Sequence, residues 1–175
     1  MKKLLVFDID QTLVDSSIRE NFCFLGDVLY LEIYQKQKHD KELGILCDSL
    51  LPLGEWLEKN ATNYDFVLCT ARQFELADFE SLYSLMPSTL SNAKHIMSRN
   101  NSLDYGGNTC ESSGHYKRPL LNWLVHWYKR PLLVLDDCLK VQTMAKNDGH
   151  FTLCARELWH YSPQEIGEKI ELCVY

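Results

Sequence analysis

Three short apolar runs, each ending at acidic or hydroxyl side chains, constrain the fold of this chain more than any other feature. They are residues 4–7 before Asp8, residues 66–69 before Thr70, and residues 131–135 before Asp136 and Asp137. Runs of this length, bounded by polar or turn-forming residues, are typical of buried parallel strands. In an open parallel sheet, the loops beyond the carboxyl ends of the strands converge on one crevice where ligands bind. The sequence therefore predicts a parallel sheet that gathers these polar side chains in one place.

The remainder of the chain alternates between helical and strand patterns. Helices are expected at residues 48–59, 74–85, 119–128, 139–146 and 163–170, and further strands at residues 93–97 and 151–154. Pro119 suits the first position of its helix, and Leu120, Leu124 and Trp127 are expected to line the buried face of that helix. Sequential parallel strands joined by right-handed crossovers give a three-layer sheet. The expected fold class is α/β, with a doubly wound, mainly parallel, Rossmann-like sheet.

Length and composition favour a single domain over residues 1–175. The chain is 46% hydrophobic, which is enough for a substantial core. Residues 16–48 do not fit the alternating pattern, and we expect them to form a small cap insert between the first strand and its helix. Residues 100–114 are rich in Asn, Ser and Gly, and are expected to form a loop that borders the crevice.

Net charge and hydropathy narrow the binding partners and the cellular location expected for this chain. The net charge is −6, so no broad basic surface for long nucleic acids is expected, although a nucleic-acid end could still enter a crevice. Only four apolar residues lie between Lys3 and Asp8, too few for the apolar core of a secretory signal. No run approaches the roughly 20 residues of a membrane helix. We expect no membrane association and a cytoplasmic location, in the host cell if the protein is phage-encoded.

The order of the polar motifs resembles the haloacid dehalogenase-like (HAD) hydrolase superfamily, most of whose members are phosphatases. The superfamily pattern is Asp-x-Asp-x-Thr/Val, then Ser/Thr, then Lys/Arg, then an acidic pair. Its counterparts in this chain are Asp8, Asp10 and Thr12, then Thr70, then Lys117, then Asp136 with Asp137. The resemblance spans about residues 3–155. A lone Asp-x-Asp would be weak evidence because an Asp at a strand end is often a cap or turn residue, whereas four motifs in order are specific.

Position 11 departs from the pattern, because many members of the superfamily carry Gly there and this chain has Gln. If the backbone at this position has a positive φ, a residue other than Gly costs about 1 kcal/mol. The sequence Asp-x-Asp-Gln-Thr also looks like the motif of phosphatases that act on the RNA polymerase tail. Gln11 therefore does not argue against catalysis.

The resemblance implies a phosphomonoesterase that works through an aspartyl-phosphate. Asp8 would attack phosphorus, a recognised covalent strategy. Asp10 would protonate the leaving oxygen and then activate the hydrolytic water. Thr70 and Lys117 would hold the phosphoryl oxygens, whose negative charge must be neutralised before attack.

The resemblance also implies Mg²⁺ as the cofactor, bound by Asp8, Asp10, Asp136 and Asp137. Oxygen ligands of this kind are the ones that Mg²⁺ prefers. Asp10 would bind the metal through its backbone carbonyl. Asp137 would contact the ion directly, and Asp136 would orient ligands or water.

The substrate is expected to be a phosphorylated small molecule or a nucleic-acid end, with no obligate protein partner. The candidate substrate-binding residues are Thr12, Thr70, Arg72, Arg99 and Lys117. The run from residue 95 to Arg99, the polar loop and Lys117 are similar to the phosphatase half of bacteriophage polynucleotide kinase-phosphatase. This similarity favours nucleotides or 3′-phosphate ends. A sugar-phosphate phosphatase and a non-catalytic binding module of the same fold remain as alternatives.

Overall fold

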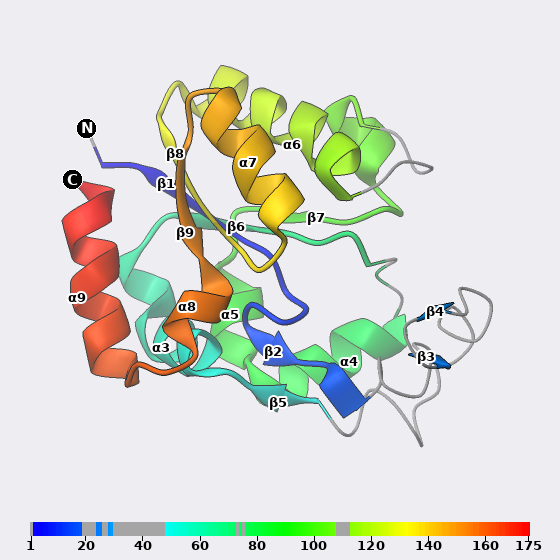
Figure 1. Ribbon diagram of the computed structural model, residues 1–175, viewed down its shortest axis with the longest axis vertical. Helices are drawn as coiled ribbons and strands as arrows, with labels where there is room; N and C mark the ends of the chain where they lie inside the picture. Colours follow the sequence, from blue (N-terminus) through cyan, green and yellow to red (C-terminus); the bar gives the residue numbers. More distant parts are fainter. Residues whose placement is uncertain are drawn as a thin grey trace.

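The computed structural model describes residues 2–18, 24–25, 28–29, 48–72, 74, 76–107 and 113–175. Its centre is a five-stranded sheet in the order β7-β6-β1-β8-β9 (Figure 1). The strands are β7 (Ile96–Met97), β6 (Phe66–Cys69), β1 (Leu4–Phe7), β8 (Leu132–Asp136) and β9 (Phe151–Cys154). All four neighbouring pairs are parallel. The predicted parallel sheet is therefore confirmed.

Helices cover both faces of the sheet, which gives three layers (Figure 1). One face packs against α3 (Pro52–Asn60), α4 (Leu76–Leu85), α5 (Pro87–Asn92), α8 (Ala155–Leu158) and α9 (Pro163–Val174). The other face packs against α6 (Ser113–Tyr128) and α7 (Leu139–Asn147). The expected doubly wound α/β class is confirmed.

The central strand β1 is buried on both sides, and its side chains alternate between the two apolar layers. Leu5 and Phe7 pack with the layer of α3 and α9, whereas Leu4 and Val6 pack with the layer of α6 and α7. This alternation is the two-residue period of a strand. Full burial of a side chain of this size contributes roughly 1.5–3 kcal/mol, so both layers hold the strand in register.

The expected start of the longest helix is wrong. α6 begins at Ser113, so Pro119 lies inside the helix and cannot donate a hydrogen bond to the carbonyl of residue 115. The helix continues through the proline because Tyr116 and Leu120 are buried against the sheet on either side of it. Trp127 is also not a core residue, because it is 66% exposed and stacks on Trp123.

Several other boundaries differ from the predicted ones. The helix expected from residue 48 begins at Pro52, because β5 (Ser49–Leu50) pairs antiparallel with β2 (Val14–Asp15). Helices α5 and α8 were not anticipated by the sequence pattern. Within the expected loop at residues 100–114, the structure has a 3-10 turn at Ser102–Tyr105 and the first residues of α6.

The cap insert expected at residues 16–48 lies largely outside the described residues. Within it, β3 (Phe24–Leu25) and β4 (Val28–Leu29) pair antiparallel. The β2–β5 ribbon brings the two ends of the insert together. Among the helices of the described segments, none is long and apolar enough to cross a membrane.

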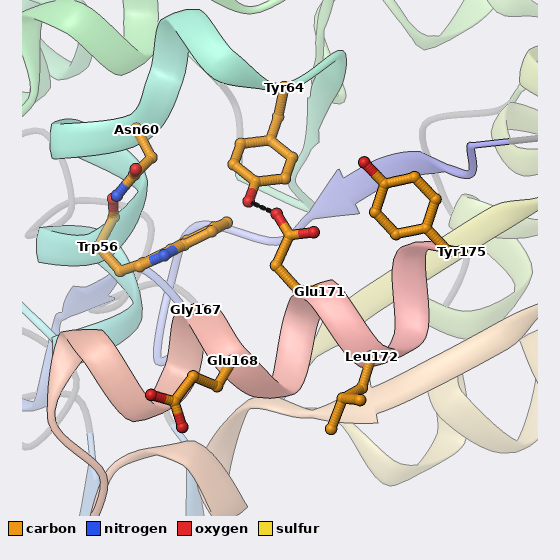
Figure 2. A pocket seen from close by; sticks show the side chains of 8 residues that line it. All are labelled: Trp56, Asn60, Tyr64, Gly167, Glu168, Glu171, Leu172 and Tyr175. Atoms are coloured by element: carbon orange, nitrogen blue, oxygen red, sulfur yellow. Dashed lines mark hydrogen bonds between the residues drawn. The ribbon is translucent and has the colours of Figure 1, made fainter.

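A surface pocket of about 640 Å³ lies between α3 and α9 (Figure 2). Its aromatic wall includes Tyr64 and Tyr175, and the ammonium of Lys2 lies 4.6 Å from the centre of the Tyr64 ring. The pocket is at the amino end of β1, where the Lys3 amide donates to the carbonyl of Val174. The polar motifs follow the opposite, carboxyl ends of the strands, so this pocket is separate from the predicted site.

Candidate active site

The two-residue period of the strands places Asp8 and Asp136 on one face of the sheet. Asp8 continues the even-numbered positions Leu4 and Val6 of β1, and Asp136 continues the even-numbered positions of β8, which pack against α6 and α7. Lys117 extends from α6 on this same side. Its Nζ lies 2.7 Å from Oδ1 of Asp8 and 2.7 Å from Oδ2 of Asp136. The structure therefore brings together three of the predicted site residues.

All three charged groups are buried. Burial raises the pKa of Asp8 to about 8, and the negative charges of Asp136 and Asp10 act in the same direction, against the opposing effect of Lys117. Burial works to lower the pKa of Lys117, but the charges of Asp136 and Asp8 hold it well above its ordinary value. One ammonium does not offset the carboxylates gathered here, so the site favours a further cation.

Asp137 completes a cluster of donors that fits a hard divalent ion. Asp8, Asp136 and Asp137 each offer a carboxylate oxygen, and these oxygens lie within 4.8 Å of one another. Burial raises the pKa of Asp137, although Arg156 of α8 donates to its Oδ2 over 2.9 Å. An all-oxygen donor set of this size fits Mg²⁺ better than zinc.

Thr70 lies at the same edge of the sheet as Asp8. Phe7 of β1 is level with Leu68 of β6, so the residues that follow the two strands emerge side by side. Thr70 is buried, and its Oγ1 accepts a hydrogen bond from the amide of Arg72 over 3.1 Å. Thr12 is also buried, and its Oγ1 has no hydrogen-bond partner within the described part of the chain.

The backbone at Gln11 is left-handed, which is the conformation that glycine adopts without strain. Its φ is +54°, and its amide donates to the carbonyl of Val14 over 2.8 Å. The Gln11 side chain donates to Oγ of Ser16 over 3.2 Å. The turn that carries Asp10 is therefore tight, and a backbone hydrogen bond closes it.

The guanidinium of Arg72 is directed toward carboxylates of the protein itself. Its Nε donates to Oδ2 of Asp10 over 3.1 Å, and its Nη2 donates to Oδ1 of the same residue. Its Nη1 donates to Asp78 of α4 over 3.1 Å, and Asp48, just before β5, lies 3.6 Å from Nη2. The sequence suggested substrate binding for Arg72, and the structure pairs it with Asp10.

Arg99 borders the loop that carries Thr70. Its Nε donates to the carbonyl of Ala71 over 2.6 Å, and its amide donates to the carbonyl of Arg72. The guanidinium carbon lies 4.8 Å from the centre of the Tyr116 ring. Arg99 thus joins the wall of the site, while a contact between Arg99 and substrate stays a prediction.

Four residues of the site were not identified from the sequence: Asp48, Asp78, Tyr116 and Arg156. Asp78 resembles an ordinary acidic residue in the first turn of a helix, and Asp48 follows a segment with no clear pattern. For Tyr116 the sequence offers one signal, namely its position immediately before Lys117. Its hydroxyl is buried and has no hydrogen-bond partner among the residues that the structure describes.

The comparisons with known proteins agree with this geometry. A family model described as bacteriophage T5 5′-deoxynucleotidase matches residues 1–161. No curated protein matches the chain significantly. Among solved structures, a putative β-phosphoglucomutase from Thermotoga maritima is 14% identical, with a TM-score of 0.64, over 97% of this chain and 99% of that one.

Two further solved structures have the same fold. A HAD-superfamily hydrolase of subfamily IA, variant 1, from Geobacter sulfurreducens PCA is 14% identical, with a TM-score of 0.59, over 88% of this chain and 89% of that one. CbbY from Rhodobacter sphaeroides, solved in complex with phosphate, is 16% identical, with a TM-score of 0.54, over 87% and 85%. At these identities the likeness establishes the fold, which is that of the HAD hydrolases.

Proposed function

We propose that this chain, which belongs to the bacteriophage T5 5′-deoxynucleotidase family, removes the 5′-phosphate from deoxynucleoside monophosphates with the help of Mg²⁺. The expectation of a HAD-type phosphatase is confirmed by this family membership together with the fold shared with the solved structures. The observation that carries the chemistry is the placement of Lys117 between Asp8 and Asp136, with Asp137 beside them.

The proposed metal ligands are Asp8, Asp137 and the backbone carbonyl of Asp10. Asp136 would orient these ligands or water. Both oxygens of Asp136 already accept hydrogen bonds, from Lys117 and from the amide of Cys138. Among the described residues, Arg156 alone donates to Asp137, and both of its hydrogen bonds go to Oδ2. This difference supports Asp137 as the direct ligand. Bound Mg²⁺ would neutralise charge on the phosphate and align it for attack.

Asp8 is the proposed nucleophile. Its carboxylate oxygen would form a bond to phosphorus while the bond from phosphorus to the 5′ oxygen breaks, and Asp10 would give its proton to that oxygen. Lys117 and Thr70 would bind the phosphoryl oxygens. Asp10, now a carboxylate, would take a proton from water as the water attacks the aspartyl-phosphate and releases inorganic phosphate.

The substrate proposal combines the family with the charge of the chain. The description of the family names a 5′-deoxynucleotidase, which supports the nucleotide half of the sequence-based expectation. A net charge of −6 disfavours a surface that follows a long phosphate backbone. Deoxynucleoside 5′-monophosphates are therefore preferred here over nucleic-acid 3′-phosphate ends and over sugar phosphates.

The test is a substrate panel of the four deoxynucleoside 5′-monophosphates, 3′-phosphorylated oligonucleotides and sugar phosphates, assayed with chelator and with Mg²⁺. We expect the highest kcat/KM for a deoxynucleotide, no turnover in chelator, and full recovery on adding Mg²⁺. Ca²⁺ should bind and inhibit, because its looser coordination misplaces the reacting groups. A preference for sugar phosphates would overturn the substrate, and full activity in excess chelator would overturn the metal.

The covalent step has its own test. Acid quenching during turnover of a ³²P-labelled substrate should trap label on the protein, and Asp8→Asn should abolish both the label and the turnover. Asp10→Asn should be nearly as damaging to turnover of a deoxynucleotide, because it removes the proton donor. An Asp8→Asn protein that keeps most of its activity would exclude the aspartyl-phosphate.

A further inference from the structure

We infer that Arg72 is a positioning residue, which holds the Asp10 carboxylate in the orientation that proton transfer requires and does not bind the substrate phosphate. The inference rests on the proposed function, because it takes Asp10 as the acid and base of that reaction. It assigns to Arg72 a different role from the substrate contact that the sequence suggested.

Asp10 needs a partner of this kind. The Gln11 turn fixes its backbone, but its side chain still rotates about two bonds and is 18% exposed. A proton donor must lie within hydrogen-bond reach of the leaving oxygen, and a misplacement of about 1 Å can cost about 100-fold in rate. The orientation of the Asp10 carboxylate therefore bears directly on the rate of proton transfer.

Arg72 constrains this carboxylate. Its Nε and Nη2 donate to the two different oxygens of Asp10, so the planar guanidinium fixes the plane of the carboxylate as well as its position. A Lys ammonium at this position would act as a single point charge without that fork.

Arg72 is itself immobilised from three sides. Its amide donates to Oγ1 of Thr70, its Nη1 donates to Asp78, and Asp48 lies beside its Nη2. The side chains of Arg72 and Asp78 are both 0% exposed. The orientation of Asp10 therefore depends on α4, on the loop after β6, and on the chain just before β5.

The same contacts argue against a phosphate-binding role. An arginine that binds substrate must direct N–H groups into the crevice, whereas all three nitrogens of this guanidinium already contact carboxylates of the protein. Its complete burial keeps it out of reach of a ligand at the surface of the site. The loop after β6 nonetheless connects the two proposed roles, which are orientation of Asp10 and binding of phosphate. The hydroxyl of Thr70, which would bind phosphate, also accepts a hydrogen bond from the amide of Arg72.

The test compares two leaving groups. Arg72→Lys keeps the charge and removes the fork, so kcat/KM for a deoxynucleotide should fall roughly 10- to 100-fold. With p-nitrophenyl phosphate, whose leaving group departs without a proton, kcat/KM should stay within about 3-fold of wild type. Inhibition by inorganic phosphate should be unchanged, because the phosphate site is intact.

A matched control is available in Arg118, which makes a similar two-pronged contact with Asp148 at the surface, at 2.7 and 2.6 Å. Arg118→Lys should change neither substrate. An equal loss for both substrates in Arg72→Lys, with weaker inhibition by phosphate, would make Arg72 a phosphate ligand and overturn the inference. Unchanged rates with both substrates would overturn it as well.

Asp78→Asn covers the case in which Arg72→Lys does not fold. It keeps an oxygen acceptor for Nη1 and replaces a residue outside the proposed catalytic group, yet it loosens the anchor of Arg72. We expect about a 3- to 10-fold loss with the deoxynucleotide and none with p-nitrophenyl phosphate; no selective loss would overturn the inference. A wild-type protein inactive on deoxynucleotides would refute only the proposed substrate, because the comparison can use any phosphate ester of an aliphatic alcohol that it hydrolyses.

Discussion

Nζ of Lys117 lies 2.7 Å from Oδ1 of Asp8, which places a fixed positive charge directly against the proposed nucleophile. The same ammonium is equally close to Asp136, on the strand that neighbours β1. A buried ammonium that bridges two carboxylates from adjacent strands keeps both carboxylates in place before substrate arrives. It also offers a hydrogen-bond donor at the position where phosphoryl oxygens are expected.

Replacing Lys117 with Met should lower kcat/KM by roughly 100- to 1000-fold, the scale of one preorganised group that stabilises charge. The loss should appear with p-nitrophenyl phosphate as well as with a deoxynucleotide, because both share the phosphoryl group. Lys140→Met, an exposed lysine at the start of α7, serves as the control and should behave as wild type. A Lys117→Met enzyme within 10-fold of wild type would remove Lys117 from the catalytic group.

The free energy of unfolding of the metal-free protein should depend on Asp8 in a defined direction. Burial raises the pKa of Asp8 from 3.8 to about 8, so the folded state holds a proton that the unfolded state has already lost above pH 4. This contribution is fully present below pH 4 and is lost as the pH rises toward 8. The stability of Asp8→Asn relative to wild type should therefore increase by about 3–5 kcal/mol over this window.

Urea unfolding in excess chelator between pH 4.5 and 8.5 measures this difference. Burial lowers the pKa of His95 and of His150, which adds a slope of opposite sign, but this slope is common to both proteins and cancels. Adding Mg²⁺ at pH 8 should stabilise wild type more than Asp8→Asn. Parallel stability curves for the two proteins would contradict the raised pKa.

Substitutions at Gln11 should follow the requirements of its left-handed backbone. A non-glycine residue at positive φ costs roughly 1–2 kcal/mol, whereas glycine relieves this strain but increases the entropy of the unfolded chain. Gln11→Gly should therefore stay within about 1 kcal/mol of wild type in urea unfolding. Gln11→Val should be less stable by a further 1–2 kcal/mol or so, because a β-branched side chain tolerates this conformation poorly. Equal stability of the two variants would show that the turn can relax.

Gly54 of α3 is a position where alanine should be harmful. A Cβ there would lie 2.2 Å from the carbonyl oxygen of Leu13, just after the turn that carries Asp10 and Gln11. Gly54→Ala should lose about 1–3 kcal/mol of stability, although alanine is favoured over glycine in a helix by about 1 kcal/mol. Turnover should also fall, because the displaced backbone carries Asp10. Gly114→Ala in α6 is the control, since within the described part of the chain its Cβ meets nothing closer than 3.8 Å.

The sequence was most informative where burial is complete. Strands β1 and β6 are apolar throughout, and β8 is apolar up to its last residue, Asp136, so their positions follow from hydropathy alone. The proximity of Asp8 and Asp136 then follows from the convergence of parallel strands at one edge, whereas Lys117, which lies on α6, was expected there from the resemblance to the HAD hydrolases.

The parts that could not be predicted depend on contacts made in the folded structure. Arg72 is close to Asp10 in space and 62 residues away in sequence, so no local pattern distinguishes it from an arginine that faces substrate. Pro119 has a strong preference for the start of a helix, but the burial of Tyr116 before it outweighs that preference. Trp127 fits the helical period of core residues, and only the finished structure shows that it stacks on Trp123 at the surface.

Because β1 is apolar on both faces, the side on which Asp8 emerges depends on the exact number of residues in this strand. All four residues of the strand are apolar and buried, so either face could be presented to either layer with little change in composition. Deleting one residue between positions 4 and 7 would leave a strand that is still apolar, but it would reverse the parity of everything that follows. Asp8 would then face the layer of α3 and α9, away from Lys117. The position of Asp8, the proposed nucleophile, therefore depends on the number of residues in β1 as well as on their apolar character.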